Sequence, residues 1–86
     1  MIALPAELTL DQASAVLAQL ESALAAEEQP TLDASALIKL DSSAVAVLLQ
    51  CQRTASAQGK RLKIIGTPPK LDELAKLYGV AELIGI

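Results

Sequence analysis

Residues 39–50, KLDSSAVAVLLQ, place an acid and two hydroxyls directly before six residues that are all alanine, valine or leucine. Asp41, Ser42 and Ser43 each carry an oxygen that can accept a hydrogen bond from a free N–H group in the first turn of a helix. The apolar run that follows is suited to the buried face of that helix. This stretch therefore predicts a capped, largely buried helix that opens at Asp41 or Ser42.

The helix is expected to run from about Ser42 to Gln58, because Gly59 is a favoured residue just beyond a helix end. Before it, TLDA (residues 31–34) predicts a strand. The intervening SALIKL (residues 35–40) is ambiguous between a loop and a short irregular strand.

A strand and a helix are also predicted upstream of these elements. MIAL (residues 1–4) is a short apolar run stopped by Pro5, which suits a strand. Thr9 with Gln12 matches a capping box, and apolar residues then recur at three- and four-residue steps up to Glu28. They predict an amphipathic helix of about sixteen residues. The residues assigned to its apolar face are Leu10, Ala13, Val16 or Leu17, Leu20 and Leu24.

Downstream, KRLKIIG (residues 60–66) predicts a strand with alternating apolar residues. TPPKLDELAKLYGV (residues 67–80) predicts a helix that is entered through prolines and left at Gly79. Its leucines, Leu71, Leu74 and Leu77, are assigned to the core. The tail AELIGI (residues 81–86) fits either a short strand or a helical turn.

Strands and helices thus alternate along the chain, which predicts parallel strands joined by right-handed crossovers. The expected fold class is α/β, with a parallel or mixed sheet of about four strands. Residues 1–86 are expected to form one domain, since no linker, repeat or low-complexity segment interrupts them.

Composition excludes several functions. The formal net charge is −3 and Tyr78 is the sole aromatic residue, which argues against nucleic-acid binding. The chain has no histidine, so it lacks the Ser-His-Asp triad, the Cys-His pair and imidazole metal ligands. Lys39 precedes Ser42 and Ser43, whereas a Ser-x-x-Lys nucleophile has its lysine one turn after the serine. We expect neither an enzyme nor a metal site.

Other segments have ordinary explanations. Pro68 and Pro69 remove N–H donors from the loop that would otherwise cradle a phosphate, so no cofactor is expected there. The lone Cys51 is interpreted as a small buried hydrophobic residue in a reducing compartment. No apolar run reaches eighteen residues and Met1 is not followed by a basic n-region, so the sequence predicts a cytoplasmic protein. The basic run at 59–63 either keeps a sheet edge soluble or forms a docking patch.

The start of the central helix leaves one question open. A single cap satisfies its needs, yet three candidates stand in a row, so at least one hydroxyl is surplus. A phosphoryl group on such a serine would gain from the positive end of the helix and would add negative charge beside Asp41. Capping alone and a contact or switch site are therefore equally supported by these physical arguments.

About residues 30–83 resemble a STAS domain, the fold shared by sulphate-transporter tails and anti-sigma-factor antagonists. The family pattern is a strand that ends in a Leu-Asp-Leu-Ser-like segment, followed by Asp-Ser-Ser-Gly or Asp-Thr-Ala-Gly at a helix start. Here LDAS (residues 32–35) stands at the first segment and DSSA (residues 41–44) at the second. The strand after the glycine-containing loop also matches.

The closing LDELAKLYGV (residues 71–80) looks most like the cytoplasmic STAS subunit of the Mla phospholipid-transport ABC system, which maintains outer-membrane lipid asymmetry in Gram-negative bacteria. That resemblance implies a non-enzymatic subunit that docks on the transporter's ATPase subunit and lies peripheral to the inner membrane. The implied contact residues are Asp41, Ser42 and Ser43, with Lys39, Ala44 and Tyr78 as possible interface residues. In antagonist members the serine that corresponds to Ser42 is phosphorylated by an anti-sigma factor kinase, which is the alternative reading.

Two departures from the family pattern matter. Ala44 replaces the family glycine, which disfavours a kinase that needs close backbone approach and favours simple docking. Many members also have an additional strand before the one at residues 1–4. Its absence would leave a sheet edge uncovered, so the chain is expected to self-associate in isolation through that edge or through a helix, for example as a homodimer.

Overall fold

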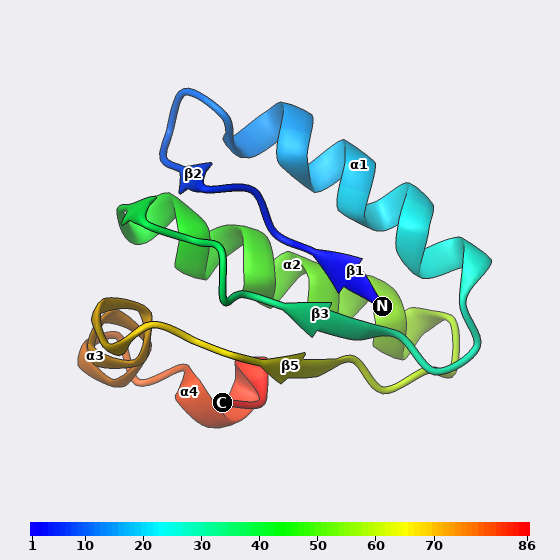
Figure 1. Cartoon of the computed structure of the whole chain (residues 1–86). Coiled ribbons are helices and arrows are strands. Elements are labelled where there is room, and N and C mark those ends of the chain that lie inside the picture. The colour runs from blue at the N-terminus through cyan, green and yellow to red at the C-terminus, as the bar shows by residue number, and fades with distance from the viewer.

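The computed structural model describes residues 1–86 and shows the predicted alternation of strands and helices (Figure 1). The tail (residues 81–86) forms a helical turn rather than a short strand. In chain order, the elements are β1 (Ile2–Ala3), β2 (Glu7–Leu8), α1 (Ala13–Ala26), β3 (Thr31–Asp33), β4 (Lys39–Leu40), α2 (Ser42–Ala57), β5 (Lys63–Ile65), α3 (Pro69–Leu77) and α4 (Ala81–Ile84).

Every strand pairing is parallel, which confirms the predicted fold class. β1, β3 and β5 form a three-stranded sheet in the order β1-β3-β5, and β2 pairs with β4. The chain moves from β1 to β3 through α1 and from β3 to β5 through α2, so both crossovers step in the same direction across the sheet. Two right-handed crossovers in one direction place both helices on the same face.

The strands are shorter and more numerous than predicted because two extended segments are interrupted. Pro5 has no N–H group and separates β1 from β2. Before Pro5, the Leu4 N–H donates to the Asp33 carbonyl (2.9 Å). After Pro5 the segment changes partner, and the Lys39 N–H donates to the Ala6 carbonyl (3.0 Å). SALIKL is thus a loop that ends in the short strand β4.

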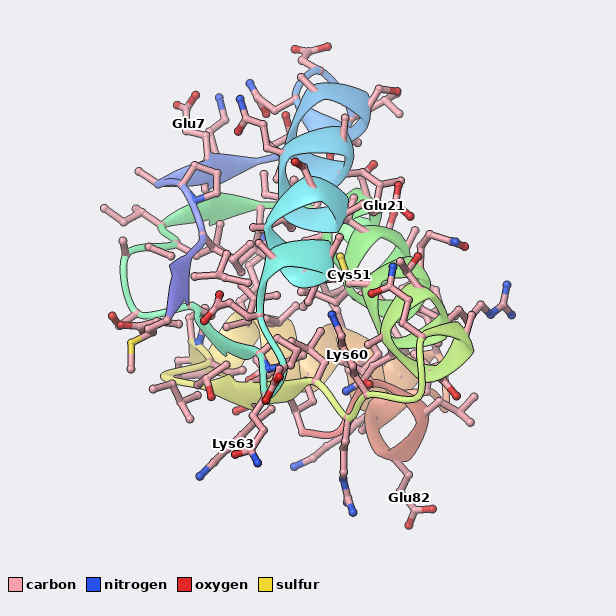
Figure 2. The ribbon with its side chains drawn as sticks, turned by 90° about the vertical axis from the view of Figure 1, so that its right-hand side faces the viewer. Glu7, Glu21, Cys51, Lys60, Lys63 and Glu82 are labelled. Atoms are coloured by element: carbon pink, nitrogen blue, oxygen red, sulfur yellow. The ribbon has the colours of Figure 1, made fainter.

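The helices cover one face of the sheet and leave the other open. Leu32 of β3 and Ile64 of β5 are buried, whereas Lys63 of β5 is exposed. Figure 2 shows Glu7 and Lys63 on the side away from the helices, while Cys51 lies on the helix side. Parallel sheets are usually covered on both faces. This molecule is therefore a two-layer structure with a solvent-exposed sheet face.

One hydrophobic cluster of 21 buried residues fills the space between the sheet and the helices. The central element is α2, which packs against α1, α3 and α4. Leu48 and Cys51 of α2 are fully buried, and burial raises the pKa of the Cys51 thiol to about 12. Cys51 is thus a buried apolar side chain, as predicted.

The start of α1 differs from the prediction. Thr9 and Gln12 do interact, since the Thr9 N–H donates to Gln12 Oε1 (2.9 Å). That contact closes a separate turn, and α1 begins only at Ala13 and ends at Ala26 rather than at Glu28. The assignment of Leu10 to the apolar face of α1 was consequently wrong, because its side chain is 75% exposed.

The assignment of Leu77 to the core was also wrong. Leu71 and Ala75, four residues apart on α3, are buried, Leu74 is half-buried and Leu77 is 75% exposed. Steps of three residues fall short of a full helical turn, so the side-chain direction drifts by about 60° per step. Two such steps carry Leu77 about 120° away from the direction of Leu71, and its side chain leaves the core.

β1 lies at one edge of the three-stranded sheet, and self-association through this edge stays a prediction. An exposed edge offers unpaired N–H and C=O groups to a second chain. Light scattering at high micromolar concentration is expected to report a mass above that of the 8.9 kDa monomer. A monomer under those conditions would contradict the prediction.

Candidate functional site

The predicted cap of the central helix is present, and Asp41 provides it. α2 begins at Ser42, and the Asp41 backbone before it is extended. The Ser43 N–H donates to Asp41 Oδ1 at 2.8 Å, and the Ala44 N–H donates to the Asp41 carbonyl at 3.0 Å. One of the three candidate residues therefore satisfies the helix end, and neither serine hydroxyl is required as the cap.

The second carboxylate oxygen of Asp41 makes a long-range contact. The Leu10 N–H donates to Asp41 Oδ2 at 3.2 Å, which joins residues 31 positions apart in the chain. The same side chain thus caps α2 and fixes the turn that precedes α1. The β2–β4 pairing brings these segments together, since Leu8 stands opposite Leu40.

These contacts stabilise the ionised form of Asp41. The Ser43 N–H is the main cause that holds the pKa of Asp41 below its usual value, although partial desolvation opposes it. The Leu10 N–H, the Ser43 hydroxyl and the positive charge of Lys70 lower the pKa further. At neutral pH the carboxylate is therefore charged and fully engaged with its neighbours.

The lowered pKa of Asp41 predicts acid destabilisation. The folded pKa lies below the unfolded value of 3.8, so the unfolded state holds more protons between the two values. The contribution of Asp41 to stability is complete above 3.8 and is lost as the pH falls through the folded pKa. Asp33 behaves alike, because the side chain and N–H of Ser35 bind its carboxylate and lower its pKa.

Urea unfolding at a series of pH values between about 6 and about 2.5 tests this expectation. The urea midpoint should hold steady at the upper end and fall at the lower end. Asp41→Asn keeps a cap oxygen but does not titrate in this range, so its midpoint should fall less. An equal fall in both proteins would contradict the role of Asp41.

Ser42 is the serine that remains free. Its side chain is exposed, and no hydrogen bond within the protein involves its hydroxyl. Ser43 is half-buried, and its hydroxyl lies beside the Asp41 carboxylate. The hydroxyl left over after capping is therefore that of Ser42, and it stands in solvent at the positive end of α2.

The remaining predicted interface residues differ in their exposure and in the elements that carry them. Lys39 is exposed on β4, close to Ser42 in sequence. Ala44 is fully buried, so its side chain belongs to the core and not to a contact surface. Ala44 lies in regular helix without a positive φ, so the backbone there does not require the family glycine. Tyr78 is exposed and lies at the carboxyl end of α3.

Two residues that were not predicted as site residues interact with Asp41, the residue before Ser42. Leu10 is exposed and held to Asp41, and Lys70 is exposed at the start of α3, with its charge acting on Asp41. We call Leu10, Asp41, Ser42 and Lys70 the α2 corner. In Figure 1 the starts of α2 and α3 and the loop after β2 lie at the same end of the molecule.

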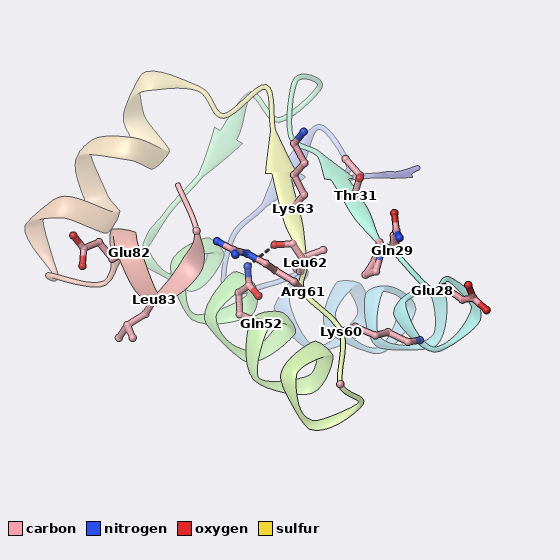
Figure 3. A pocket seen from close by; sticks show the side chains of 13 residues that line it. Glu28, Gln29, Thr31, Gln52, Lys60, Arg61, Leu62, Lys63, Glu82 and Leu83 are labelled. Atoms are coloured by element: carbon pink, nitrogen blue, oxygen red, sulfur yellow. Dashed lines mark hydrogen bonds between the residues drawn. The ribbon is translucent and has the colours of Figure 1, made fainter.

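A shallow hollow at the amino end of β5 is lined mainly by polar residues (Figure 3). Lys60 Nζ donates to the carbonyls of Leu24 (2.8 Å) and Ala25 (3.2 Å) at the end of α1. Gln52 Nε2 donates to the carbonyls of Leu62 (2.7 Å) and Ile84 (2.6 Å). These polar side chains serve the fold, so the α2 corner is the better candidate site.

A family model for STAS domains matches residues 1–85, so the chain belongs to the STAS domain family. The description of that model is "Mlab, STAS domain", which confirms the predicted likeness to the Mla-type subunit. A comparison with curated proteins finds no match. Members of the STAS family act in protein interactions. None of the helices has the length and hydropathy that a bilayer crossing demands.

Proposed function

We propose that this domain is a non-enzymatic subunit that docks on and regulates the ATPase subunit of an Mla-type phospholipid-transporting ABC system. In this proposal it helps to maintain outer-membrane lipid asymmetry, works in the cytoplasm and is held at the inner membrane through its complex. The match to the Mlab-type family model supports the choice of partner.

The observation that carries the proposal is the free hydroxyl of Ser42. Asp41 uses both carboxylate oxygens within the fold, so Ser42 is left to bind another molecule. The hydroxyl sits on the first residue of a 16-residue helix that is anchored in the core. A contact group on such a rigid element is already positioned, which lowers the entropy lost when a partner binds.

The surroundings of Ser42 support docking rather than catalysis. A serine nucleophile requires a base within hydrogen-bond distance, and no hydrogen bond joins its hydroxyl to any side chain. The carboxylate of the preceding residue, Asp41, is already occupied by the Ser43 and Leu10 N–H groups. Ser42 can therefore donate or accept a hydrogen bond across an interface without a chemical step.

Ser42→Glu is expected to weaken binding to the purified ATPase subunit at least tenfold, about 1.4 kcal/mol, because a carboxylate would have to be desolvated in the interface. Folding should be preserved, since an acidic residue in the first turn of a helix is favourable. Ser22→Glu, at an exposed position of α1, serves as the matched control. Isothermal titration calorimetry measures the affinities, and an unchanged value for Ser42→Glu would refute the site.

The alternative is an anti-sigma factor antagonist that is switched by phosphorylation at Ser42. The exposed hydroxyl at the positive end of α2 favours it, because a phosphoryl group there would be stabilised by the helix and by Lys70. Incubation with a cognate kinase and ATP, followed by intact-mass measurement, separates the alternatives. An added phosphate that is absent from Ser42→Ala supports the switch, and an unchanged mass supports docking.

A further inference from the structure

The face of the sheet that the helices leave open is made by the residues next to the buried ones. Successive side chains of a strand point to opposite faces, and each strand has a residue that points into the core, such as Leu32 of β3 and Ile64 of β5. Their neighbours share the other face, where Figure 2 shows Glu7 and Lys63. We call this surface the open sheet face. Its strand residues include Ala3, Glu7, Asp33, Lys39, Lys63 and Ile65.

A β-bulge adds an apolar side chain to this face. The Ile38 and Lys39 N–H groups both donate to the Ala6 carbonyl, at 2.8 and 3.0 Å, so two residues of one segment stand opposite one residue of the other. Such a bulge re-aims a side chain out of the strict alternation. Leu37 and Leu40 point into the core, whereas Ile38 joins Lys39 on the open side. Ile38 is 82% exposed, more than any other large apolar residue of the chain.

The charges of the open sheet face cancel. Glu7 and Asp33 are balanced by Lys39 and Lys63, and Glu7 stands directly opposite Lys39 in the β2–β4 pairing. The formal net charge of −3 is therefore carried by the rest of the chain. Two identical molecules repel each other through an acidic surface, whereas a neutral surface with charges of both signs is complementary to its own copy. This charge pattern indicates a second copy as the molecule that covers the face.

We propose that two copies of this chain pack open sheet face against open sheet face in a symmetric dimer. Parallel sheets are usually covered on both faces, and two sheets can pack face to face. In a two-fold arrangement one surface serves both partners, so each copy provides Ala3, Ile38 and Ile65 for packing and both signs of charge for ion pairs. The inference does not rest on the proposed function, because Ser42 lies on α2, in the helix layer.

Sedimentation equilibrium of the chain at concentrations up to about 1 mM measures dimers with Kd values in the micromolar to millimolar range. Ile38→Asp should raise the dimer Kd about tenfold or more, because a carboxylate would be desolvated between the two sheets. Leu83→Asp, at a 65% exposed leucine of α4, is the matched control and should dimerise like the wild type. A wild type that stays monomeric at the highest concentration, or equal losses in the two variants, would overturn the inference.

Ala3→Pro separates this dimer from one that pairs through the β1 edge. The Leu4 N–H is bonded to β3, so the preceding N–H, that of Ala3, faces the free edge of β1. Proline removes this edge donor and keeps an apolar side chain on the face. The face-to-face dimer should therefore persist in Ala3→Pro. A dimer that is lost in Ala3→Pro and kept in Ile38→Asp would be an edge pairing and would overturn the inference.

Glu7→Lys and Lys63→Glu test whether the occupant is a second copy. Each substitution gives the open sheet face an excess charge of one sign, so each variant alone should dimerise several-fold more weakly than the wild type. An equal mixture of the two should recover the dimer, because a positive face then meets a negative one. Urea midpoints confirm that both variants are folded. Unchanged dimers in the single variants, or a mixture that associates no better than they do, would contradict the inference.

Discussion

Leu48→Ala is expected to lower the free energy of unfolding by about 3 kcal/mol, within the range of about 2–5 kcal/mol for buried leucines. Leu48 is fully buried in α2, the helix that packs against α1, α3 and α4. Truncation would leave a cavity in the core beneath α2, which the surrounding elements would fill only in part. A chain of 86 residues has a total stability of about 4 to 13 kcal/mol, so the loss is a large fraction.

Urea denaturation followed by circular dichroism measures this effect. The control is Leu77→Ala, since Leu77 is the same residue type in a helix but is 75% exposed. Its free energy of unfolding should change by less than about 0.5 kcal/mol. Similar midpoints for the two variants would show that Leu48 does not occupy the centre of the core.

Gly66→Ala is expected to cost about 3 kcal/mol for two reasons that act together. Gly66 has a φ of +68°, where an alanine costs about 1–2 kcal/mol. An added Cβ would also lie 3.0 Å from Asp33 Oδ1 and 3.1 Å from the Ser35 nitrogen. These atoms form a hydrogen bond of 2.9 Å with each other, so moving either one alone would strain that bond. Displacing them adds about 1–3 kcal/mol.

Gly59 supplies the matched control for Gly66. Its φ is +72°, nearly the same, but an added Cβ at this position meets nothing within 4 Å. Gly59→Ala should therefore cost only the backbone strain, about 1–2 kcal/mol. Thermal or urea unfolding of both variants gives the difference. Equal losses would mean that the close approach to Asp33 and Ser35 contributes nothing.

The fold was predictable where local patterns and packing agree. Val16, Leu20 and Leu24 recur at four-residue steps and are all buried on α1. The pattern failed at both Leu10 and Leu77, which carry the same apolar side chain as the core residues. Leu10 precedes the point where the helix starts, and Leu77 lies where three-residue steps have drifted off the buried stripe. Hydrophobicity alone does not distinguish such positions.

The candidate site was predictable only in its local part. Asp41, Ser42 and Ser43 are adjacent in the chain, and a cap followed by a free hydroxyl follows from the chemistry of one helix end. The Leu10 contact depends on the β2–β4 pairing, and the place of Lys70 depends on how α3 packs. Both are set by tertiary structure, which no local pattern in a single sequence reports.

The division of the sheet has a mechanical consequence. β2 and β4 are joined by two residue pairs and share no strand with the β1-β3-β5 sheet. A short ladder of this kind opens at a lower free energy than a central one, so its amide hydrogens should exchange with solvent sooner. The β2–β4 edge can thus open locally while α2, which carries Ser42, and the larger sheet stay as they are.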